Sequence, residues 1–443
     1  MKISIIGAGY VGLVTAACFS EFGYKVVCID KDKKKVNQLK QNIIPIYEPG
    51  LYDLVKKNAQ SGYLEFSNNL KELHNSNIIF IAVGTPTMRR GDGEADLKYV
   101  YQVVKDISIF LSKKNKKLIV TKSTVPIGTG SIIISKLKKL RKDLIYGEDY
   151  HVASNPEFLR EGSAIEDFLR PDRVVCGISN EFSEKILYKL YSPLNLREAP
   201  LLFTDIESAE LIKYSSNAFL AMKISFINEM ADLCEKVGGN VQLIAKGMGL
   251  DNRIGSKFLH PGPGFGGSCF PKDTRALYSS FKKNKVKATI TKAVIEFNDN
   301  RKVNMVRKVK KALESPIKEK VIAFLGVTFK PNTDDIRESS SLVIIPALVK
   351  EGAILRVHDP AYNKSFLKIK EFKKVKWVKN VFNAIKNADI LIIHTEWNEY
   401  RALNLVKTKK LLRQSKVLDF RNIFNKMEMF KLGFDYTSLG IKK

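Results

Sequence analysis

The sequence predicts an α/β protein in which two doubly wound domains, one at each end of the chain, are joined by a long central helix. Two observations lead to this fold class. Short apolar runs alternate with helical patterns at both ends of the 443-residue chain, as in parallel sheets covered by helices. Between them, positions 204–237 contain neither Pro nor Gly, which is typical of one long helix.

The N-terminal domain opens with a strand, a turn, a helix and a second strand within its first thirty residues. The apolar run 3–6 precedes the periodic segment 11–22, Gly23 ends that segment, and 25–30 is the next apolar run. This order is a βαβ unit. Further buried strands are expected over 78–83, 118–123 and 174–177. We therefore assign residues 1–196 to one domain with a doubly wound parallel sheet.

The central and C-terminal parts follow from the same patterns. Thr204 and Glu207 have the spacing of a capping box at the start of the long helix, which at 1.5 Å per residue would span about 50 Å. Helical patterns return at 273–278 and 291–312, so 197–315 reads as a helical region. Strands over 321–326, 354–359 and 388–394 alternate with a helix over 339–350, which Pro346 could break. Residues 316–443 therefore form a second, smaller α/β domain.

The composition excludes several classes of function. The formal net charge is +28, yet Lys and Arg are spread over many short runs, so we expect no nucleic-acid partner and only a positive field that attracts anionic substrates. No apolar run approaches the ~18 residues of a membrane span. The five cysteines contain no CxxC pair and the five histidines no HExxH motif, so we expect no metal site. No signal peptide is recognisable, and a cytoplasmic location fits.

Gly7, Gly9 and Gly12 form a GxGxxG pattern between the first strand and the first helix. In this context Gly7 makes the tight turn, Gly9 lets the backbone approach a pyrophosphate, and Gly12 lets the helix pack closely on the strand. Asp30 ends the second strand, where its carboxylate can accept hydrogen bonds from an adenosine ribose. The pattern predicts a Rossmann-like domain that binds NAD rather than NADP; a glycine turn without a ligand is the alternative.

The segment 261–273 has four glycines and three prolines in thirteen residues, which rules out a regular helix or strand. Its residue Cys269 stands just before Pro271, which suits the first turn of a helix, with Lys272 and Asp273 beside it. A helix N-terminus and a neighbouring lysine both favour the thiolate form of a cysteine. We therefore expect Cys269 to be a nucleophile; a buried cysteine after a tight turn is the alternative.

Three further pairs of side chains are candidates for the same site. Thr85 and Thr124 follow the ends of two predicted strands, the edge at which open α/β sheets bind ligands. Glu157 and Glu161 are four residues apart and would repel each other unless a cation such as Arg160 lies nearby. On the long helix, Lys213 and Asn217 share one face and would stabilise an oxyanion. Ordinary turns and a solvated lysine remain the alternatives.

Taken together, these motifs resemble those of the nucleotide-sugar 6-dehydrogenases, the UDP-glucose/GDP-mannose dehydrogenase family. The resemblance runs along nearly the whole chain, through GAGYVGL, VGTPT, KSTVP, NPEFLREG, ELIKYSSNAFLAMKISFINE, RIGSKFLHPGPGFGGSCFPKD, GVTFKPNTDDIRESS and LDFRN. The glycine-rich loop with its cysteine is the most specific of them.

The resemblance implies a four-electron oxidation of UDP-glucose at C6, with two NAD reduced and the aldehyde held on the enzyme. The same chemistry on GDP-mannose or a UDP-N-acetylhexosamine is the close alternative, and a redox-inactive nucleotide-sugar-binding protein is a distant one. The family also implies a homodimer formed through the central helical region, an N-terminal NAD domain and a C-terminal UDP-sugar domain.

The resemblance further implies roles for individual residues. The catalytic group comprises Cys269, Lys213, Asn217, Asp273, Glu157 and Thr124. The cofactor group comprises Gly7, Gly9, Val11, Gly12, Asp30, Lys35, Thr85, Thr124, Glu161, Lys272 and Arg337. The substrate group comprises Glu157, Phe158, Leu159, Arg160, Glu161, Lys213, Asn217, Arg253, Phe258, Leu259, His260, Pro261, Gly262, Gly266, Lys330 and Arg421. No metal ligand is implied.

Overall fold

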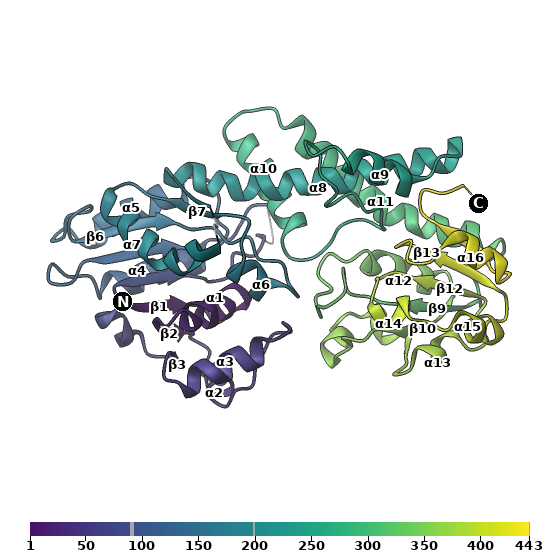
Figure 1. The fold of residues 1–443 in the computed structure, drawn as a ribbon, viewed down its shortest axis with the longest axis horizontal. Coiled ribbons are helices and arrows are strands. Elements are labelled where there is room, and N and C mark those ends of the chain that lie inside the picture. Colours follow the sequence, from purple (N-terminus) through teal and green to yellow (C-terminus); the bar gives the residue numbers. More distant parts are fainter. Residues whose placement is uncertain (89–92, 198–199, 443) are drawn as a thin grey trace. The chain divides into compact units, whose positions relative to one another are not determined.

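The computed structural model describes residues 1–88, 93–197 and 200–442 (Figure 1). The chain forms two compact units. The first contains Met1–Ser216 and Ser279–Lys285, and the second contains Asn217–Tyr278 and Val286–Lys443. Each unit has its own sheet covered by helices, which confirms the predicted α/β class. The finer division into three domains at residues 196 and 315 stays a prediction.

The first unit is built on an eight-stranded sheet with the order β3-β2-β1-β4-β5-β6-β7-β8. Its strands are β1 (Lys2–Ile6), β2 (Lys25–Ile29), β3 (Leu64–Ser67), β4 (Ile78–Ile81), β5 (Lys117–Thr121), β6 (Tyr150–Ser154), β7 (Val174–Gly177) and β8 (Leu201–Thr204). Neighbours are parallel except β6 and β7, which meet in one antiparallel bridge between Ser154 and Gly177. The prediction of a wholly parallel sheet was therefore wrong at this one pairing.

Helices cover both faces of the first sheet, as expected for a doubly wound domain. They are α1 (Tyr10–Glu21), α2 (Lys33–Lys40), α3 (Leu51–Gln60), α4 (Lys98–Ser108), α5 (Thr129–Leu140), α6 (Ala164–Leu169) and α7 (Glu181–Tyr191), with short 3-10 turns at Leu70–Asn75 and Ser192–Arg197. Along β4, Ile78 and Phe80 belong to one apolar cluster, whereas Ile79 and Ile81 belong to another. The strand is thus apolar on both sides, as a sheet buried on both faces requires.

The second unit contains a six-stranded sheet, parallel throughout, with the order β11-β10-β9-β12-β13-β14. The strands are β9 (Val321–Leu325), β10 (Ile354–His358), β11 (Lys376–Trp377), β12 (Ile390–Ile393), β13 (Lys416–Asp419) and β14 (Asp435–Ser438). Along β12, Ile390 and Ile392 pack into one cluster, and Leu391 and Ile393 pack into the other. This sheet is therefore also covered on both faces.

The helices of the C-terminal half include two long ones, α10 (Phe270–Lys283) and α11 (Thr289–Leu313). The others are α9 (Val241–Gly249), α12 (Ser341–Lys350), α13 (Val381–Ile385), α14 (Asn398–Arg401), α15 (Leu405–Leu411) and α16 (Lys426–Lys431), with 3-10 turns at Lys364–Lys368 and Glu371–Lys373. Pro346 lies inside α12, and the helix continues through it.

The predicted long helix is α8 (Ile206–Val237), whose 32 residues correspond to about 48 Å. The boundary between the two units falls within this helix. Its cap differs from the prediction, because Asp205 and not Thr204 accepts a hydrogen bond from the backbone N–H of Ser208 at 2.7 Å. A carboxylate one residue nearer the helix is the better placed acceptor for the first free N–H groups.

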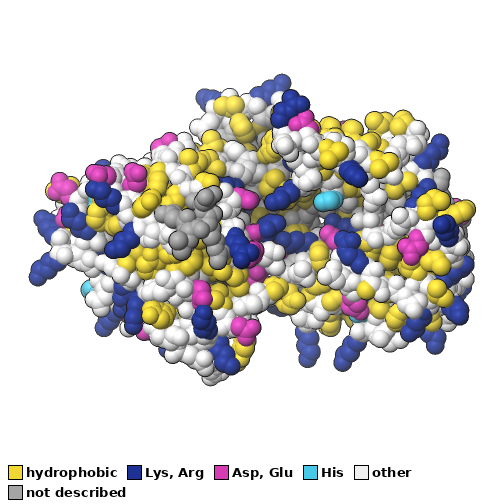
Figure 2. All heavy atoms as spheres, in the orientation of Figure 1, with side chains coloured by type: hydrophobic (Ala, Val, Ile, Leu, Met, Phe, Trp, Pro, Cys, Tyr) yellow, Lys and Arg dark blue, Asp and Glu magenta, His cyan; other side chains and the backbone are white. Residues whose placement is uncertain are grey.

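Lys and Arg side chains are not gathered in one part of the face drawn in Figure 2. On the face drawn in Figure 2, Lys and Arg side chains occur across both units. No helix of the described residues is long and apolar enough to cross a membrane. Among the same residues, no group of three or more His, Cys, Asp or Glu side chains is arranged to hold a metal ion.

Glu210 attaches the start of α8 to the N-terminus of α5. Its carboxylate accepts hydrogen bonds from the backbone N–H groups of Gly128 at 2.7 Å and of Gly130 at 2.8 Å, and its residue is only 2% exposed. Burial raises the pKa of Glu210 to about 7, although these N–H groups oppose the rise. A helix N-terminus is a favourable place for the ionised carboxylate, but burial outweighs it here.

The raised pKa predicts how stability depends on pH. Between the ordinary glutamate pKa and about 7, the folded chain holds a proton on Glu210 that the unfolded chain has lost, so the free energy of unfolding falls as pH rises. The loss reaches at most about 3 kcal/mol. Between pH 5 and pH 8, the midpoint of urea unfolding should therefore fall further for the unmodified chain than for Glu210→Gln. Parallel pH dependence of the two proteins would contradict this assignment.

Candidate functional site

The glycine turn lies at the carboxyl end of β1, between that strand and α1. Gly7 has a φ of +110°, and its N–H donates to the carbonyl of Ile29 at 2.7 Å. A Cβ on Gly12 would lie 1.8 Å from the Gly7 carbonyl oxygen, whereas a Cβ on Gly9 would meet no protein atom within 4 Å. Gly12 is thus needed for helix–strand packing. The space above Gly9 is open, as the approach of a pyrophosphate requires.

Asp30 follows the end of β2 and faces the same turn. Its carboxylate accepts hydrogen bonds from the N–H groups of Ala8 and Asp32, both at 2.9 Å, and pairs with the Lys35 ammonium at 3.1 Å. Burial by itself raises the pKa of Asp30, but these partners together lower it below its usual value. An ionised carboxylate at this position suits a ribose hydroxyl and disfavours a 2′-phosphate, so the residues fit NAD.

The loops that follow β4 and β5 meet at the same edge. The Thr85 hydroxyl donates to the Thr124 carbonyl at 2.8 Å, and the Ser123 hydroxyl donates to the Val83 carbonyl at 2.7 Å. The structure therefore brings Thr85 and Thr124 together, as the sequence predicted. Since the Thr85 proton is already used within the protein, this hydroxyl would meet a ligand as an acceptor.

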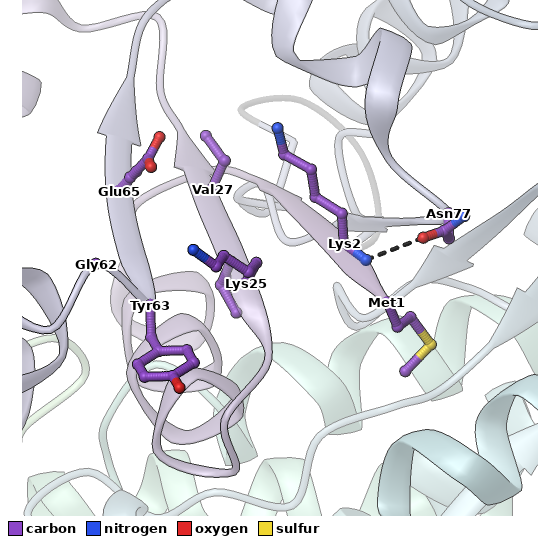
Figure 3. A pocket seen from close by; sticks show the side chains of 9 residues that line it. Met1, Lys2, Lys25, Val27, Gly62, Tyr63, Glu65 and Asn77 are labelled. Carbon is purple, nitrogen blue, oxygen red and sulfur yellow. Dashed lines mark hydrogen bonds between the residues drawn. The ribbon is translucent and has the colours of Figure 1, made fainter.

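An open pocket of about 480 Å³ lies at the opposite edge of this sheet and is not the candidate site (Figure 3). It is lined by residues at the amino ends of β1 and β2, among them Lys2 and Lys25, and by Tyr63 and Asn77. Ligands of open α/β sheets bind at the carboxyl ends of the strands.

A buried ion pair joins the loop after β6 to α8. The Lys213 ammonium lies 3.1 Å from the Glu157 carboxylate, and the two residues are 3% and 6% exposed. Burial alone raises the pKa of Glu157, but the nearby Lys213 charge and the Leu159 N–H lower it overall. The Phe158 ring lies beside this pair, 5.1 Å from the Lys213 ammonium. The structure thus brings together residues that are 56 positions apart (213 − 157).

Arg160 is not the cation that pairs with Glu157, contrary to our expectation. Its guanidinium pairs with Asp167 at 2.5 Å, and its backbone N–H donates to the same carboxylate. The cation of Glu157 is Lys213 instead. Asp167, in the following helix α6, holds both the side chain and the backbone N–H of Arg160. Whether Arg160 also contacts a substrate stays a prediction.

In the second unit, Cys269 directly precedes α10, as predicted. Its carbonyl accepts the hydrogen bond from the Asp273 N–H at 2.8 Å, which begins the helix, and Pro271 lies in the first turn. The residue is partly exposed, and its sulfur lies 3.5 Å from the Ser268 hydroxyl. The thiol therefore stands where a helix N-terminus stabilises a thiolate.

Asp273 connects the first turn of α10 to two other candidate residues. The Asn217 side-chain amide donates to its carboxylate at 2.6 Å, and the Lys272 ammonium lies 3.0 Å from the other oxygen. Asn217 and Asp273 are 6% and 1% exposed. These contacts fix the orientation of the amide, because its nitrogen donates to the carboxylate.

The glycine-rich loop is held by two buried residues of α11 that the sequence analysis did not single out. Asn298 accepts from the Phe265 N–H at 2.8 Å and donates to the Phe265 carbonyl at 3.1 Å. Arg301 donates to the Gly262 carbonyl at 3.0 Å and pairs with Asp232 at 2.6 Å. The only sequence signal for Asn298 and Arg301 was their spacing of three positions in a segment predicted to be helical, which puts them on one face.

The remaining predicted substrate and cofactor residues of the second unit lie in its loops. Arg421 donates to the carbonyls of His394 at 2.8 Å and Phe329 at 2.9 Å. Arg337 pairs with Asp335 at 2.8 Å, and Arg253 pairs with Asp251 at 2.6 Å. The predicted substrate residues of the cysteine loop are mostly buried, namely Leu259, Pro261, Gly262 and Gly266. In the same loop Phe258 is half-buried and His260 is exposed, and Lys330 in another loop is half-buried. The ligand contacts of these residues stay predictions.

Family models match the chain in three successive segments. They describe the UDP-glucose/GDP-mannose dehydrogenase family: its NAD binding domain over residues 1–195, its central domain over 207–300 and its UDP binding domain over 323–426. The chain belongs to this family. The resemblance predicted from the sequence motifs is thereby confirmed, and the chain is an NAD-dependent dehydrogenase with a nucleotide-sugar substrate.

Individual family members are similar over their full lengths. UDP-glucose 6-dehydrogenase of Rhizobium meliloti is 49% identical over 443 residues, with 99% of each chain covered. The structure of a UDP-glucose dehydrogenase from Pyrobaculum islandicum is 34% identical, has a TM-score of 0.89, and covers 100% of this chain and 98% of its own. The UDP-D-ManNAc dehydrogenase of Pyrococcus horikoshii is 26% identical with a TM-score of 0.86, covering 99% of both chains.

The two glycines of the dinucleotide turn predict different outcomes when a methyl group is added. Gly9→Ala should keep stability within about 1 kcal/mol, since its Cβ is unobstructed, yet weaken NAD binding at least ~10-fold because the methyl group lies where the pyrophosphate approaches. Gly12→Ala should lose both NAD binding and about 1–3 kcal/mol of stability, because its Cβ would overlap the Gly7 carbonyl. For each variant, the melting temperature reports stability and calorimetric titration with NAD reports affinity. Unchanged NAD affinity of Gly9→Ala would contradict the site.

Proposed function

We propose that this chain oxidises UDP-glucose to UDP-glucuronate in two successive steps, each reducing one NAD. The observation that carries the proposal is the position of Cys269 directly before α10, at the end of a glycine-rich loop. Full-length similarity to a UDP-glucose 6-dehydrogenase at 49% identity supports the choice of sugar nucleotide. A single oxidation to an aldehyde would not need a nucleophilic thiol, whereas oxidation to the acid has a use for one.

In the first oxidation, the C6 alcohol loses a hydride from carbon and a proton from oxygen. NAD, when bound, is the hydride acceptor. Gly9 and Asp30 would hold it by its pyrophosphate and ribose, with Thr85, Thr124, Lys35, Glu161 and Arg337 as further contacts. We assign to Lys213 the stabilisation of the negative charge that develops on the C6 oxygen, because its ammonium is buried and held in place by Glu157.

In the second oxidation, the Cys269 thiolate adds to the aldehyde and forms a thiohemiacetal. Loss of a second hydride and of the hydroxyl proton converts it to a thioester. Water then adds to the thioester, and the acid and the free thiol are released. The sum is one alcohol, two NAD and one water giving one carboxylate, two NADH and three protons. Asn217, oriented by Asp273, would donate its hydrogen bond to the oxyanions formed on the way.

Two alternatives remain with the same residues. Oxidation of GDP-mannose or a UDP-N-acetylhexosamine would use the same thiol chemistry, but the UDP-D-ManNAc dehydrogenase is only 26% identical to this chain. A redox-inactive sugar-nucleotide-binding protein would have no use for the buried Glu157–Lys213 pair, which costs desolvation energy to bury.

The proposal is tested by the number of NADH formed for each UDP-glucose consumed. The unmodified chain and Cys28→Ala, a control at a buried cysteine, should give two NADH per sugar and UDP-glucuronate. Cys269→Ala should make no UDP-glucuronate, because no thiohemiacetal can form, and give at most one NADH per sugar. Two NADH per sugar with Cys269→Ala would reject the role of the thiol. A higher kcat/KM with UDP-galactose, UDP-N-acetylglucosamine or GDP-mannose would reject the substrate.

We also propose that the chain forms a homodimer through an apolar stripe on α8 and α9. Phe219, Phe226 and Leu233 recur every seven residues on α8, so they lie along one side of the helix, and they are 59%, 43% and 52% exposed. Leu243 on α9 and Leu250, directly after that helix, repeat the spacing and are also exposed. An apolar row of this kind is covered when two copies of a helix pair.

The dimer is tested by placing a charge in the stripe. Phe226→Glu should convert the dimer to a monomer, because two copies would bring desolvated carboxylates together at the twofold axis. Ile109→Glu is the matched control, since Ile109 is 71% exposed in α4's C-terminal cap position and outside the stripe. Light scattering during gel filtration gives the mass of each. A monomeric unmodified chain, or a dimeric Phe226→Glu, would contradict the proposal.

A cytoplasmic location completes the proposal. The five cysteines are all free thiols in the structure, which suits a reducing compartment.

A further inference from the structure

Strand β5 carries a buried lysine at each end. Lys117 is its first residue and is 1% exposed, and Lys122 follows its last residue and is 4% exposed. The Lys117 ammonium donates to the carbonyls of His74 and Ser76, both at 2.9 Å, at the amino edge of the sheet. Lys122 lies at the carboxyl edge, where the candidate site is, and neither the motifs nor the proposed reaction gives it a role.

The hydrogen-bond partners of the Lys122 ammonium are neutral. It donates to the side-chain oxygen of Asn155 at 2.9 Å, and the Tyr191 hydroxyl donates to the same oxygen at 2.5 Å. The Asn155 nitrogen donates in turn to the Val175 carbonyl at 2.8 Å, which fixes the amide orientation. An aromatic ring, that of Phe168, lies 5.9 Å from the ammonium. These groups hold the lysine in place without cancelling its charge.

The charged groups that face Lys122 come from several elements packed around it. Glu157 lies in the loop after β6 and Lys213 on α8, and both interact electrostatically with Lys122. Lys122 lines one small cavity together with Asn155, Glu157, Asp167 and Arg173, and Asp167 is paired with Arg160. The thiols of Cys18 on α1 and Cys176 on β7 also face it. Burial raises the pKa of both thiols, so they are neutral near pH 7. Burial likewise raises the pKa of Tyr191.

Within the cluster formed by Lys122, Lys213 and Glu157, two ammonium groups therefore share one carboxylate, and Asp167 and Arg173 at the same cavity add one charge of each sign. Glu157 is the direct partner of Lys213 at 3.1 Å, which leaves Lys122 as the uncompensated charge. Burial lowers the pKa of Lys122, Glu157 opposes the fall and the Lys213 charge adds to it, and the resulting pKa is about 8. Groups that interact this strongly titrate as a unit, and removing one charge changes the proton affinity of the others.

We propose that Lys122 tunes the protonation of Lys213: the two ammonium groups share the Glu157 carboxylate, and their repulsion makes the cluster release a proton nearer neutral pH. This inference rests on the proposed function. It makes Lys122 a tuning residue that acts through Lys213 rather than on the substrate. An ammonium that releases its proton more readily is a stronger acid, so it donates a stronger hydrogen bond to the negative charge that develops on the C6 oxygen.

The pH dependence of kcat/KM tests the proposal. In Lys122→Met, the part of the profile that reports ionisation of the cluster should move to higher pH by about one unit. Lys213 then keeps the attraction of Glu157 and no longer feels the repulsion of a second ammonium group. The direction is the same whether the protonated or the neutral form of Lys213 is active. Lys117→Met is the matched control, a buried lysine at the other end of the same strand, and should keep the profile of the unmodified chain. An unshifted profile in Lys122→Met would overturn the proposal.

A second measurement keeps the test independent of catalysis and of the folding of Lys122→Met. With lysine labelled by 13C at Cε, NMR should show a Lys122 signal that titrates near pH 8, identified by its absence from Lys122→Arg. Glu157→Gln should move that titration to lower pH, since it removes the carboxylate that the two ammonium groups share. A Lys122 signal unaffected by Glu157→Gln would overturn the proposal. If no sugar nucleotide is oxidised, the proposed function fails, and the titration still decides the coupling.

Discussion

The first unit depends on the neutralisation of one buried carboxylate. Glu157 lies in a loop with no regular structure, and it is almost fully removed from water. A buried charge left without a partner costs about 3–5 kcal/mol, so the Lys213 ammonium and the Glu157 carboxylate have to stay together. Their contact fixes the loop after β6 against α8, and Glu210 fixes the same helix against α5. The positions of the candidate catalytic groups in this unit therefore follow from pairing charges, and only secondarily from apolar packing.

The second unit fixes its loop with one neutral side chain and one charged side chain of α11. The loop before Cys269 has many backbone N–H and C=O groups that no helix or strand satisfies, and a buried loop must find partners for them. Asn298 serves both backbone groups of Phe265, and Arg301 serves the Gly262 carbonyl while Asp232 balances its charge. Side chains of a straight helix thus give an irregular loop a fixed shape. Cys269 is carried by that loop into its place before α10.

Local patterns in the sequence predicted much of the fold. The strand–turn–helix of β1 and α1, the long helix α8 and the helix start after Cys269 each depend on residues within about ten positions of one another. Two of the departures from prediction are also local, because several neighbouring residues could make the same contact: Asp205 rather than Thr204 caps the helix, and Arg160 pairs with Asp167 rather than with Glu157. The antiparallel pairing of β7 with β6 depends instead on residues far apart in the chain. Nothing in the sequence separates the buried lysines 117 and 122 from solvated ones, since only the folded sheet shows what surrounds each ammonium.

Three buried lysines of the first unit show how the choice of partner sets the role of a cation. Lys117 is satisfied by backbone carbonyls, Lys122 by a side-chain amide, and Lys213 by a carboxylate. Only the carboxylate cancels a charge, so Lys122 adds a positive charge without a directly paired carboxylate at the carboxyl edge of the sheet. Low local polarity strengthens that charge, and dinucleotides and sugar nucleotides are both anions. The Lys122 charge therefore favours anionic ligands, as the formal net charge of +28 on the whole chain does. Lys122 does so at the edge of the sheet where the candidate site lies.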